Sequence, residues 1–250
     1  MTRVLAVERI GRGPPVLLIH GDIVGPELTW RKQRELAERW TLVIPSRPGF
    51  GDSPPLERND FEAEAPMFAE LLGDGAHLVG HSYGAVIALL AAAERPEAVR
   101  SLTVSEPGCL TVAAGTPEVD RMIADGTRLF EHAESIPSED FLRLFRGGAG
   151  SAYGTPEQLP GELLHGVELL KRERPPWEAE IPLERLAGAG FPVLVISGGH
   201  SPAFEAVCDA LAGGLSARRE VIPGRGHTVP STGPAYNERL EAHMAAVEDG

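Results

Sequence analysis

The chain has 250 residues, 42% of them hydrophobic, and a formal net charge of −13. This length suits one α/β domain with a full core, with room for an inserted cap. The negative charge argues against nucleic acids and anionic membranes as partners, because both are bound by basic surfaces.

The first residues contain no apolar run of the kind that secretory signal peptides carry, and no run of 18 apolar residues occurs anywhere. We therefore expect a cytoplasmic protein without a membrane span. Cys109 and Cys208 lie about a hundred residues apart and match no metal-binding spacing. Both are expected to be reduced, partly buried thiols.

Short apolar runs rich in Val, Ile and Leu alternate along the chain with segments of helical character. The predicted strands cover residues 16–19, 41–44, 77–79, 99–104, 193–196 and 220–222. The predicted helices cover residues 27–39, 61–72, 85–94, 203–211 and 234–247. Apolar runs bounded by Gly and Pro are typical of strands that are covered on both faces. The pattern predicts an α/β fold with a mostly parallel central sheet and helices on both faces.

The alternation stops between about residues 111 and 186, where the pattern becomes helical and more polar. A long helical insertion between two strands suggests a lid. We therefore predict a core domain of residues 1–110 and 187–250 and a helical lid of residues 111–186. The alternative is that these helices simply cover the sheet.

The sharpest local motif is the segment Gly-His-Ser-Tyr-Gly at residues 80–84. It fits the G-x-S-x-G nucleophile elbow, with a predicted strand before it and a predicted helix after it. Such a tight turn exposes the serine, so Ser82 is the candidate nucleophile, and it points the Tyr83 N–H at a developing oxyanion. The alternative is a glycine-rich structural turn with an inert serine.

A second motif, His20-Gly21-Asp22, directly follows the strand predicted at residues 16–19. Here the chain resembles the α/β-hydrolase family, in which such a loop supplies the second oxyanion-hole N–H. The resemblance implies that the Asp22 N–H is this donor and that His20 braces the loop. An acidic side chain beside an oxyanion is unfavourable, so the Asp22 carboxylate must point away or contact the substrate.

The resemblance extends over about residues 4–247 and is weakest in the predicted lid. It includes residues 46–53, which read Ser-Arg-Pro-Gly-Phe-Gly-Asp-Ser, and a Pro-Gly-Arg-Gly-His segment at residues 223–227. In the family the catalytic histidine follows the last strand in such a segment. The resemblance therefore implies that His227 is the general base that takes the Ser82 proton.

A serine hydrolase also needs an acidic residue that binds the catalytic histidine and completes a Ser-His-acid triad. The position of this acid differs here from the usual family pattern. The usual aspartate would lie in the loop at residues 197–202, which contains no carboxylate and has Ser201 at about that place. Some members carry the acid one strand earlier, and Glu106 occupies that place here. Glu205, Asp209 and Asp22 are the alternatives, and Glu106 could also be a solvated loop residue.

These residues predict hydrolysis of a carboxylic ester, lactone or thioester through an acyl-enzyme on Ser82. A serine at the elbow, where epoxide hydrolases and haloalkane dehalogenases have aspartate, argues against those reactions. No metal or organic cofactor is implied. The alternatives are C–C bond hydrolysis or acyl transfer with the same triad, and a binding protein without catalysis, which the missing aspartate favours.

The expected partner is a small, partly apolar molecule of medium size. The predicted lid is rich in aromatic residues, which could line an apolar cavity for this molecule. They could equally form the core of the lid. The residues concerned are Phe130, Phe141, Phe145, Tyr153 and Trp177.

Overall fold

A computed structural model describes residues 4–149 and 158–249. Its central element is a seven-stranded sheet with the strand order β1-β3-β2-β4-β5-β6-β7. The strands are β1 (Val7–Ile10), β2 (Pro15–Ile19), β3 (Thr41–Pro45), β4 (Ala76–His81), β5 (Val99–Ser105), β6 (Val193–Ser197) and β7 (Arg218–Val221). β1 runs antiparallel to β3, and every other neighbouring pair is parallel. The predicted fold class is therefore confirmed in its mostly parallel sheet.

The six apolar runs all form strands at or within two residues of the predicted bounds, whereas β1 was not predicted. Central strands such as β4 are buried along their whole length, which explains their continuous apolar sequence. β1 lies at the sheet edge, and its central residues Glu8 and Arg9 are exposed. A short edge strand of this kind carries too little apolar pattern to be recognised.

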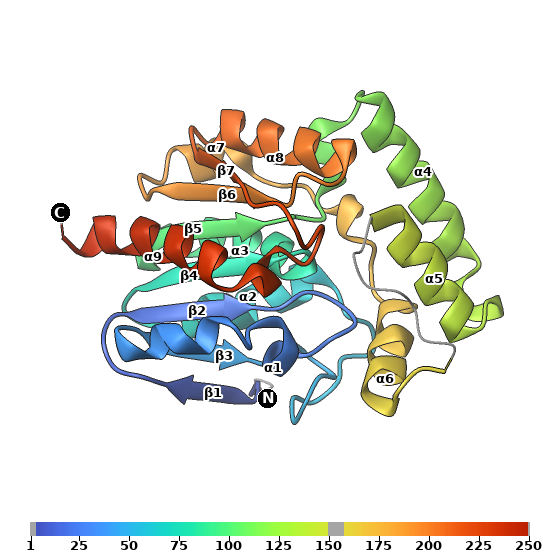
Figure 1. The fold of residues 1–250 in the computed structure, drawn as a ribbon, viewed down its shortest axis with the longest axis horizontal. Coiled ribbons are helices and arrows are strands. Elements are labelled where there is room, and N and C mark those ends of the chain that lie inside the picture. The colour runs from blue at the N-terminus through green and yellow to red at the C-terminus, as the bar shows by residue number, and fades with distance from the viewer. Residues whose placement is uncertain (1–3, 150–157, 250) are drawn as a thin grey trace.

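Two layers of helices cover the sheet (Figure 1). One apolar core contains residues of α2 (Phe61–Leu71), α3 (Tyr83–Glu94), α7 (Leu183–Ala187) and α8 (Pro202–Gly214). A second core, on the opposite face, contains Trp30, Trp40 and residues of α9 (Pro234–Glu248). Helices on both faces are thus confirmed, which explains why the strands are apolar on both sides.

One helix prediction was wrong in its length. Residues 27–39 form a single turn, α1 (Pro26–Thr29), and a 3₁₀ helix, η1 (Gln33–Glu38). Trp30 and Gln33 are both buried, and the Gln33 amide donates hydrogen bonds to Pro230 O and Asn237 Oδ1. This buried side-chain bonding takes the place of a regular helix at this position.

The segment between β5 and β6 contains α4 (Pro117–Glu131), α5 (Ser138–Ala149) and α6 (Gly161–Leu170). In Figure 1 these helices lie beyond the carboxyl ends of the parallel strands. They share a small apolar cluster of their own that includes Phe141, Leu142 and Val167. The described part of the segment also contains α7 and three 3₁₀ helices, η3 (Leu110–Ala113), η4 (Ala133–Ser135) and η5 (Pro176–Glu178). Within the described ranges, no helix is long and apolar enough to cross a membrane.

Gly84, at the start of α3, touches the backbone of β2. A Cβ atom at Gly84 would lie 2.3 Å from Ile19 O and 2.4 Å from His20 O. Because both contacts are rigid backbone atoms, Gly84→Ala is expected to lower the free energy of unfolding by about 3 kcal/mol in urea titrations. Gly213→Ala is the matched control, since a Cβ atom there meets nothing within 4 Å. Equal midpoints for the two variants would contradict the expected clash.

Candidate active site

Ser82 lies at the turn between β4 and α3, in a backbone conformation that non-glycine residues seldom adopt. Its φ is 57° and its ψ is −121°. Its N–H donates to Ser105 O at 2.9 Å, which ties the turn to the end of β5. A Cβ atom at Gly80 would lie 2.4 Å from Gly84 O, so the turn needs glycine at that position. The strained elbow predicted from the motif is therefore present.

His227 lies in the loop that follows β7, with its ring against the elbow. Its Nε2 is 2.9 Å from Ser82 Oγ. The His81 ring nitrogen Nε2 donates to the His227 carbonyl at 2.8 Å, and the Phe204 ring centroid is 4.7 Å from that of the His227 ring. The ring is thus held with one nitrogen aimed at the Ser82 hydroxyl.

Glu106 follows β5 directly and is fully buried. Its Oε2 is 3.1 Å from Nδ1 of His227, and its Oε1 accepts from the Gly198 N–H at 2.6 Å. The parallel pairing of β5 with β6 continues into Glu106, whose N–H donates to Ile196 O. This places the carboxylate beside the loop that carries the acid in most of the family.

The other candidate acids make different contacts. Glu205 accepts from Ser197 Oγ at 2.8 Å and pairs with Arg219 at 2.6 Å. Asp209 is exposed and also pairs with Arg219, and Asp22 pairs with Arg47. Glu106 is therefore the candidate acid that the structure brings to His227.

Burial shifts the pKa values of both Glu106 and His227. It raises the pKa of Glu106 to about 7, against the effect of the Gly198 N–H, which lowers it. Burial also lowers the pKa of His227 to about 4. At neutral pH the imidazole is therefore neutral. With Nδ1–H donated to Glu106, its Nε2 can accept the Ser82 proton.

The loop after β2 lies directly against the elbow. A Cβ atom at Gly21 would lie 2.9 Å from Ser82 Cβ. His20 is fully buried and bonds to Gly21 O and to the Arg47 N–H, each at 2.9 Å, as expected for a residue that braces the loop. The Asp22 carboxylate turns to Arg47, with Oδ1 2.7 Å from Nη1.

Tyr83 is the first residue of α3, so its N–H has no acceptor within the helix. Its side chain is fully buried, and the Arg47 guanidinium carbon lies 4.0 Å from its ring centroid. Together with the loop at Gly21 and Asp22, this brings both predicted oxyanion-hole residues next to Ser82.

Two cavities meet at Ser82 and His227. One has a volume of about 600 Å³ and extends below α4 and α5, and the other, of about 320 Å³, extends toward α1. Phe145 lines both cavities and Trp177 lines the larger one, whereas Phe141 is buried among the inserted helices. Phe130 packs against Phe141, Phe145 and Trp177. Tyr153 lies outside the described residues.

The inserted segment touches the Asp22 loop through α6. A Cβ atom at Gly166 would lie 1.8 Å from Ile23 O. Ile23 has a φ of 70°, which is uncommon for a β-branched residue. It also packs against the apolar cluster of the inserted helices. The loop is therefore held between the elbow on one side and α6 on the other.

Four residues that contact the candidate site were not predicted from the sequence. Arg47, Glu64 and Glu173 form a buried ionic cluster with Asp22 behind the loop. Glu173 stands in a charged run that looks solvated, so its burial had no sequence signal. His200, whose Nδ1 is 3.7 Å from Glu106 Oε1, follows β6 and is the one that strand order could have indicated.

Glu106, His200 and His227 each offer one possible metal-ligating atom, and these atoms lie within 4.8 Å of one another. Nδ1 of His227 and a carboxylate oxygen of Glu106 already share a hydrogen bond. These two residues are therefore part of the hydrogen-bonded array at Ser82, and His200 lies beside it.

Comparison with known proteins agrees with this geometry. Residues 16–238 match the model of the alpha/beta hydrolase family. The chain belongs to this family, as the resemblance of its motifs predicted.

Among its relatives are two pimeloyl-[acyl-carrier protein] methyl ester esterases. That of Chromobacterium violaceum is 34% identical over 179 residues, which are 65% of this chain and 65% of the relative. That of Methylococcus capsulatus is 35% identical over 189 residues, 70% of this chain and 66% of the relative. The chain thus spans about two thirds of the length of these relatives. An alpha/beta hydrolase structure from Sphaerobacter thermophilus is 26% identical, with a TM-score of 0.68 over 94% of this chain and 95% of that one.

Proposed function

We propose that the protein is a serine hydrolase that cleaves a carboxylic ester, lactone or thioester through an acyl-enzyme on Ser82. The observation that carries the proposal is the continuous array from Ser82 Oγ through His227 to Glu106, with distances of 2.9 Å and 3.1 Å. The esterase relatives support an ester among these substrates. The partner is a small molecule of medium size.

In the proposed mechanism His227 Nε2 takes the Ser82 proton while Oγ bonds to the substrate carbonyl carbon. The N–H groups of Asp22 and Tyr83 stabilise the resulting oxyanion. His227 then protonates the leaving group as its bond to carbon breaks. Water, deprotonated by the same nitrogen, releases the acid and restores Ser82. Each oxyanion donor is expected to contribute roughly 3 kcal/mol to lowering the barrier.

In this proposal residues 111–186 act as a lid over a core of residues 1–110 and 187–250. The larger cavity of about 600 Å³ is mostly apolar and lies under α4 and α5, which suits the acyl part of the substrate. The cavity of about 320 Å³ on the other side of Ser82 would take the leaving group. A volume of this order fits a ligand of medium size.

The test is to treat the purified protein with a fluorophosphonate and to locate the adduct by peptide mass spectrometry. Labelling of Ser82, absent in Ser82→Ala, is the expected result, and turnover of p-nitrophenyl esters, lactones and acyl thioesters then identifies the substrate class. A folded protein that is not labelled would contradict the proposal and would favour ligand binding without catalysis.

Between about pH 5.5 and 8.5, the rate of this labelling is expected to rise with pH through about 7. Burial raises the pKa of Glu106 to about 7, and the ionised carboxylate is needed to stabilise the imidazolium of His227. This rise in rate with pH reflects the titration of the Glu106–His227 pair and not of either group alone. A rate constant that stays flat between about pH 5.5 and 8.5 would contradict this assignment.

A further inference from the structure

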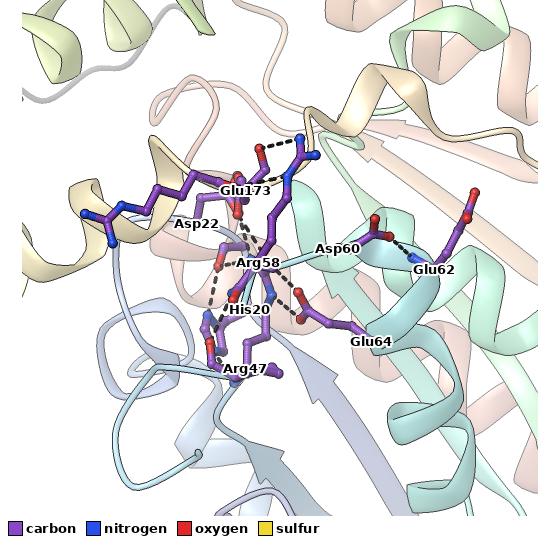
Figure 2. A network of polar contacts seen from close by, with 12 residues as sticks. His20, Asp22, Arg47, Arg58, Asp60, Glu62, Glu64 and Glu173 are labelled. Atoms are coloured by element: carbon purple, nitrogen blue, oxygen red, sulfur yellow. Dashed lines mark hydrogen bonds and ion pairs between the residues drawn. The ribbon is translucent and has the colours of Figure 1, made fainter. Parts of the chain in front are cut away.

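Behind the Asp22 loop, three acidic side chains converge on the guanidinium of Arg47 (Figure 2). Glu64 binds it with two hydrogen bonds of 2.8 Å and 3.0 Å, and Asp22 accepts from Nη1 at 2.7 Å. Glu173 Oε2 lies farther away, 3.5 Å from Nη2. The Arg47 and Glu64 side chains are fully buried, and those of Glu173 and Asp22 are 1% and 6% exposed.

One buried cation cannot balance three buried carboxylates, so at least one of them is expected to hold a proton. The hydrogen bonds indicate which one. Asp22 and Glu64 take the near positions on Arg47. Glu173 Oε1 is buried without a donor among the described residues. The Glu173 and Asp22 side chains lie within hydrogen-bonding reach of each other, a contact that requires a proton between them.

The environment of Glu173 favours its neutral form. Burial holds the pKa of Glu173 well above its usual range, and the negative charge of Asp22 raises it further. The positive charge of Arg47 lowers the pKa of Glu173, but the short hydrogen bonds of Arg47 are made to Glu64 and Asp22. The charged and titratable groups that face Glu173 are Asp22, Arg47, Glu64 and Tyr83.

We infer that Glu173 is a protonated positioning residue, which donates a hydrogen bond to the Asp22 carboxylate and so fixes the Asp22 N–H at the oxyanion site. The inference rests on the proposed function, because it assigns that N–H to the oxyanion. The bond would also keep a second buried negative charge away from the place where the oxyanion forms. Arg47, which contacts both Asp22 and the Tyr83 ring, connects the pair to the other donor.

The contact between Glu173 and Asp22 also joins two separate parts of the chain. Glu173 follows α6, and Arg58 donates to the carbonyls of Arg172 and Glu173 at 3.2 Å and 3.4 Å. These bonds hold the backbone after α6 in place, while the Glu173 side chain reaches Arg47 and Asp22. Glu173 therefore links the proposed lid to the oxyanion site through one carboxyl group.

Two substitutions separate positioning from mere packing. Glu173→Gln cannot ionise, but its amide can still donate to Asp22. Glu173→Leu has a similar volume and no donor. Glu178→Gln is the control, because Glu178 lies in the same segment but is exposed and pairs with Arg174 at 3.0 Å. Thermal melts would establish that each variant is folded.

The measurement is the rate of fluorophosphonate labelling of Ser82 from about pH 6 to 10. The wild type and Glu178→Gln are expected to lose rate at alkaline pH, as Glu173 ionises. Glu173→Gln should keep the neutral rate within about threefold and lack this alkaline limb. Glu173→Leu should be slowed about 10-fold or more at every pH, a fraction of the loss seen when a whole oxyanion donor is removed.

An alkaline limb in Glu173→Gln equal to that of the wild type, or a wild-type rate in Glu173→Leu, would overturn the inference. A direct readout that does not depend on activity is the ¹³C NMR shift of the Glu173 carboxyl. A neutral carboxyl at pH 7 supports the inference, and an ionised one overturns it. Wild-type protein that is not labelled at any pH would instead overturn the proposed function, so the two failures are distinguishable.

Discussion

Replacement of Ser82 by alanine is expected to lower kcat for ester hydrolysis by about 10⁶-fold, the loss measured when a triad serine is removed from a serine protease. The substitution removes only the hydroxyl group, whose Oγ lies 2.9 Å from His227 Nε2. The imidazole and the oxyanion donors therefore stay in place. The readout is the steady-state hydrolysis of a p-nitrophenyl ester, with protein freed of contaminating esterases.

Ser201→Ala provides the control for this experiment. Ser201 is also buried, and it precedes α8 at about the place where the family usually carries its acid. Its side chain makes no capping bond to the helix, so turnover close to that of the wild type is expected. Residual activity of Ser82→Ala above about 1% of wild type would show that another nucleophile is responsible.

Glu106→Gln is expected to lower kcat by about 10⁴-fold and at the same time to stabilise the protein. The amide cannot stabilise an imidazolium as a carboxylate does, and the equivalent change in a serine protease has a loss of this size. The stability gain follows from burial, which raises the pKa of Glu106 from 4.5 to about 7. Ionising this carboxyl in the folded state therefore costs up to about 3 kcal/mol at pH well above 7.

The pH dependence has a definite sign. Because the folded-state pKa of Glu106 is the higher one, its contribution to stability is fully present below about 4.5 and is lost as the pH rises through about 7. The advantage of Glu106→Gln in urea unfolding should accordingly be small at pH 4.5 and largest above pH 7. Glu205→Gln and Asp209→Asn are the controls for kcat, since both carboxylates pair with Arg219. A normal kcat in Glu106→Gln would remove Glu106 from the mechanism.

The parts of the site that the sequence predicted are those with local signals. The elbow at Ser82 needs a strand, a strained turn and a helix in direct succession, and all three are visible in residues 76–94. His227 was predicted from the family resemblance of the short segment at residues 223–227, which follows a strand. Glu106 depended on topology, because its contact with His227 requires β5, β6 and the β7 loop to open at one edge.

The parts that the sequence did not predict depend on long-range burial. Glu64 and Glu173 look like members of charged helix and loop surfaces, yet both are buried against Arg47. A polar side chain on an amphipathic segment gives no sign of a partner in another segment, whether that partner is 17 residues away, as for Glu64 and Arg47, or 126, as for Glu173 and Arg47. The single helix predicted for residues 27–39 was wrong for the same reason, since the buried bonds of Gln33 with Pro230 and Asn237 decide the local conformation.

The close contact between Gly166 and the carbonyl of Ile23 has a consequence for protein engineering. A Cβ atom at Gly166 would lie 1.8 Å from that oxygen. Exchanging residues 111–186 for the corresponding segment of another hydrolase is a natural way to alter substrate range. A donor segment with any side chain at this position would push against the Asp22 loop. Chimeras are therefore expected to lose turnover on all substrates together unless glycine is kept at the position of Gly166. Every exchanged segment must therefore carry glycine at this position.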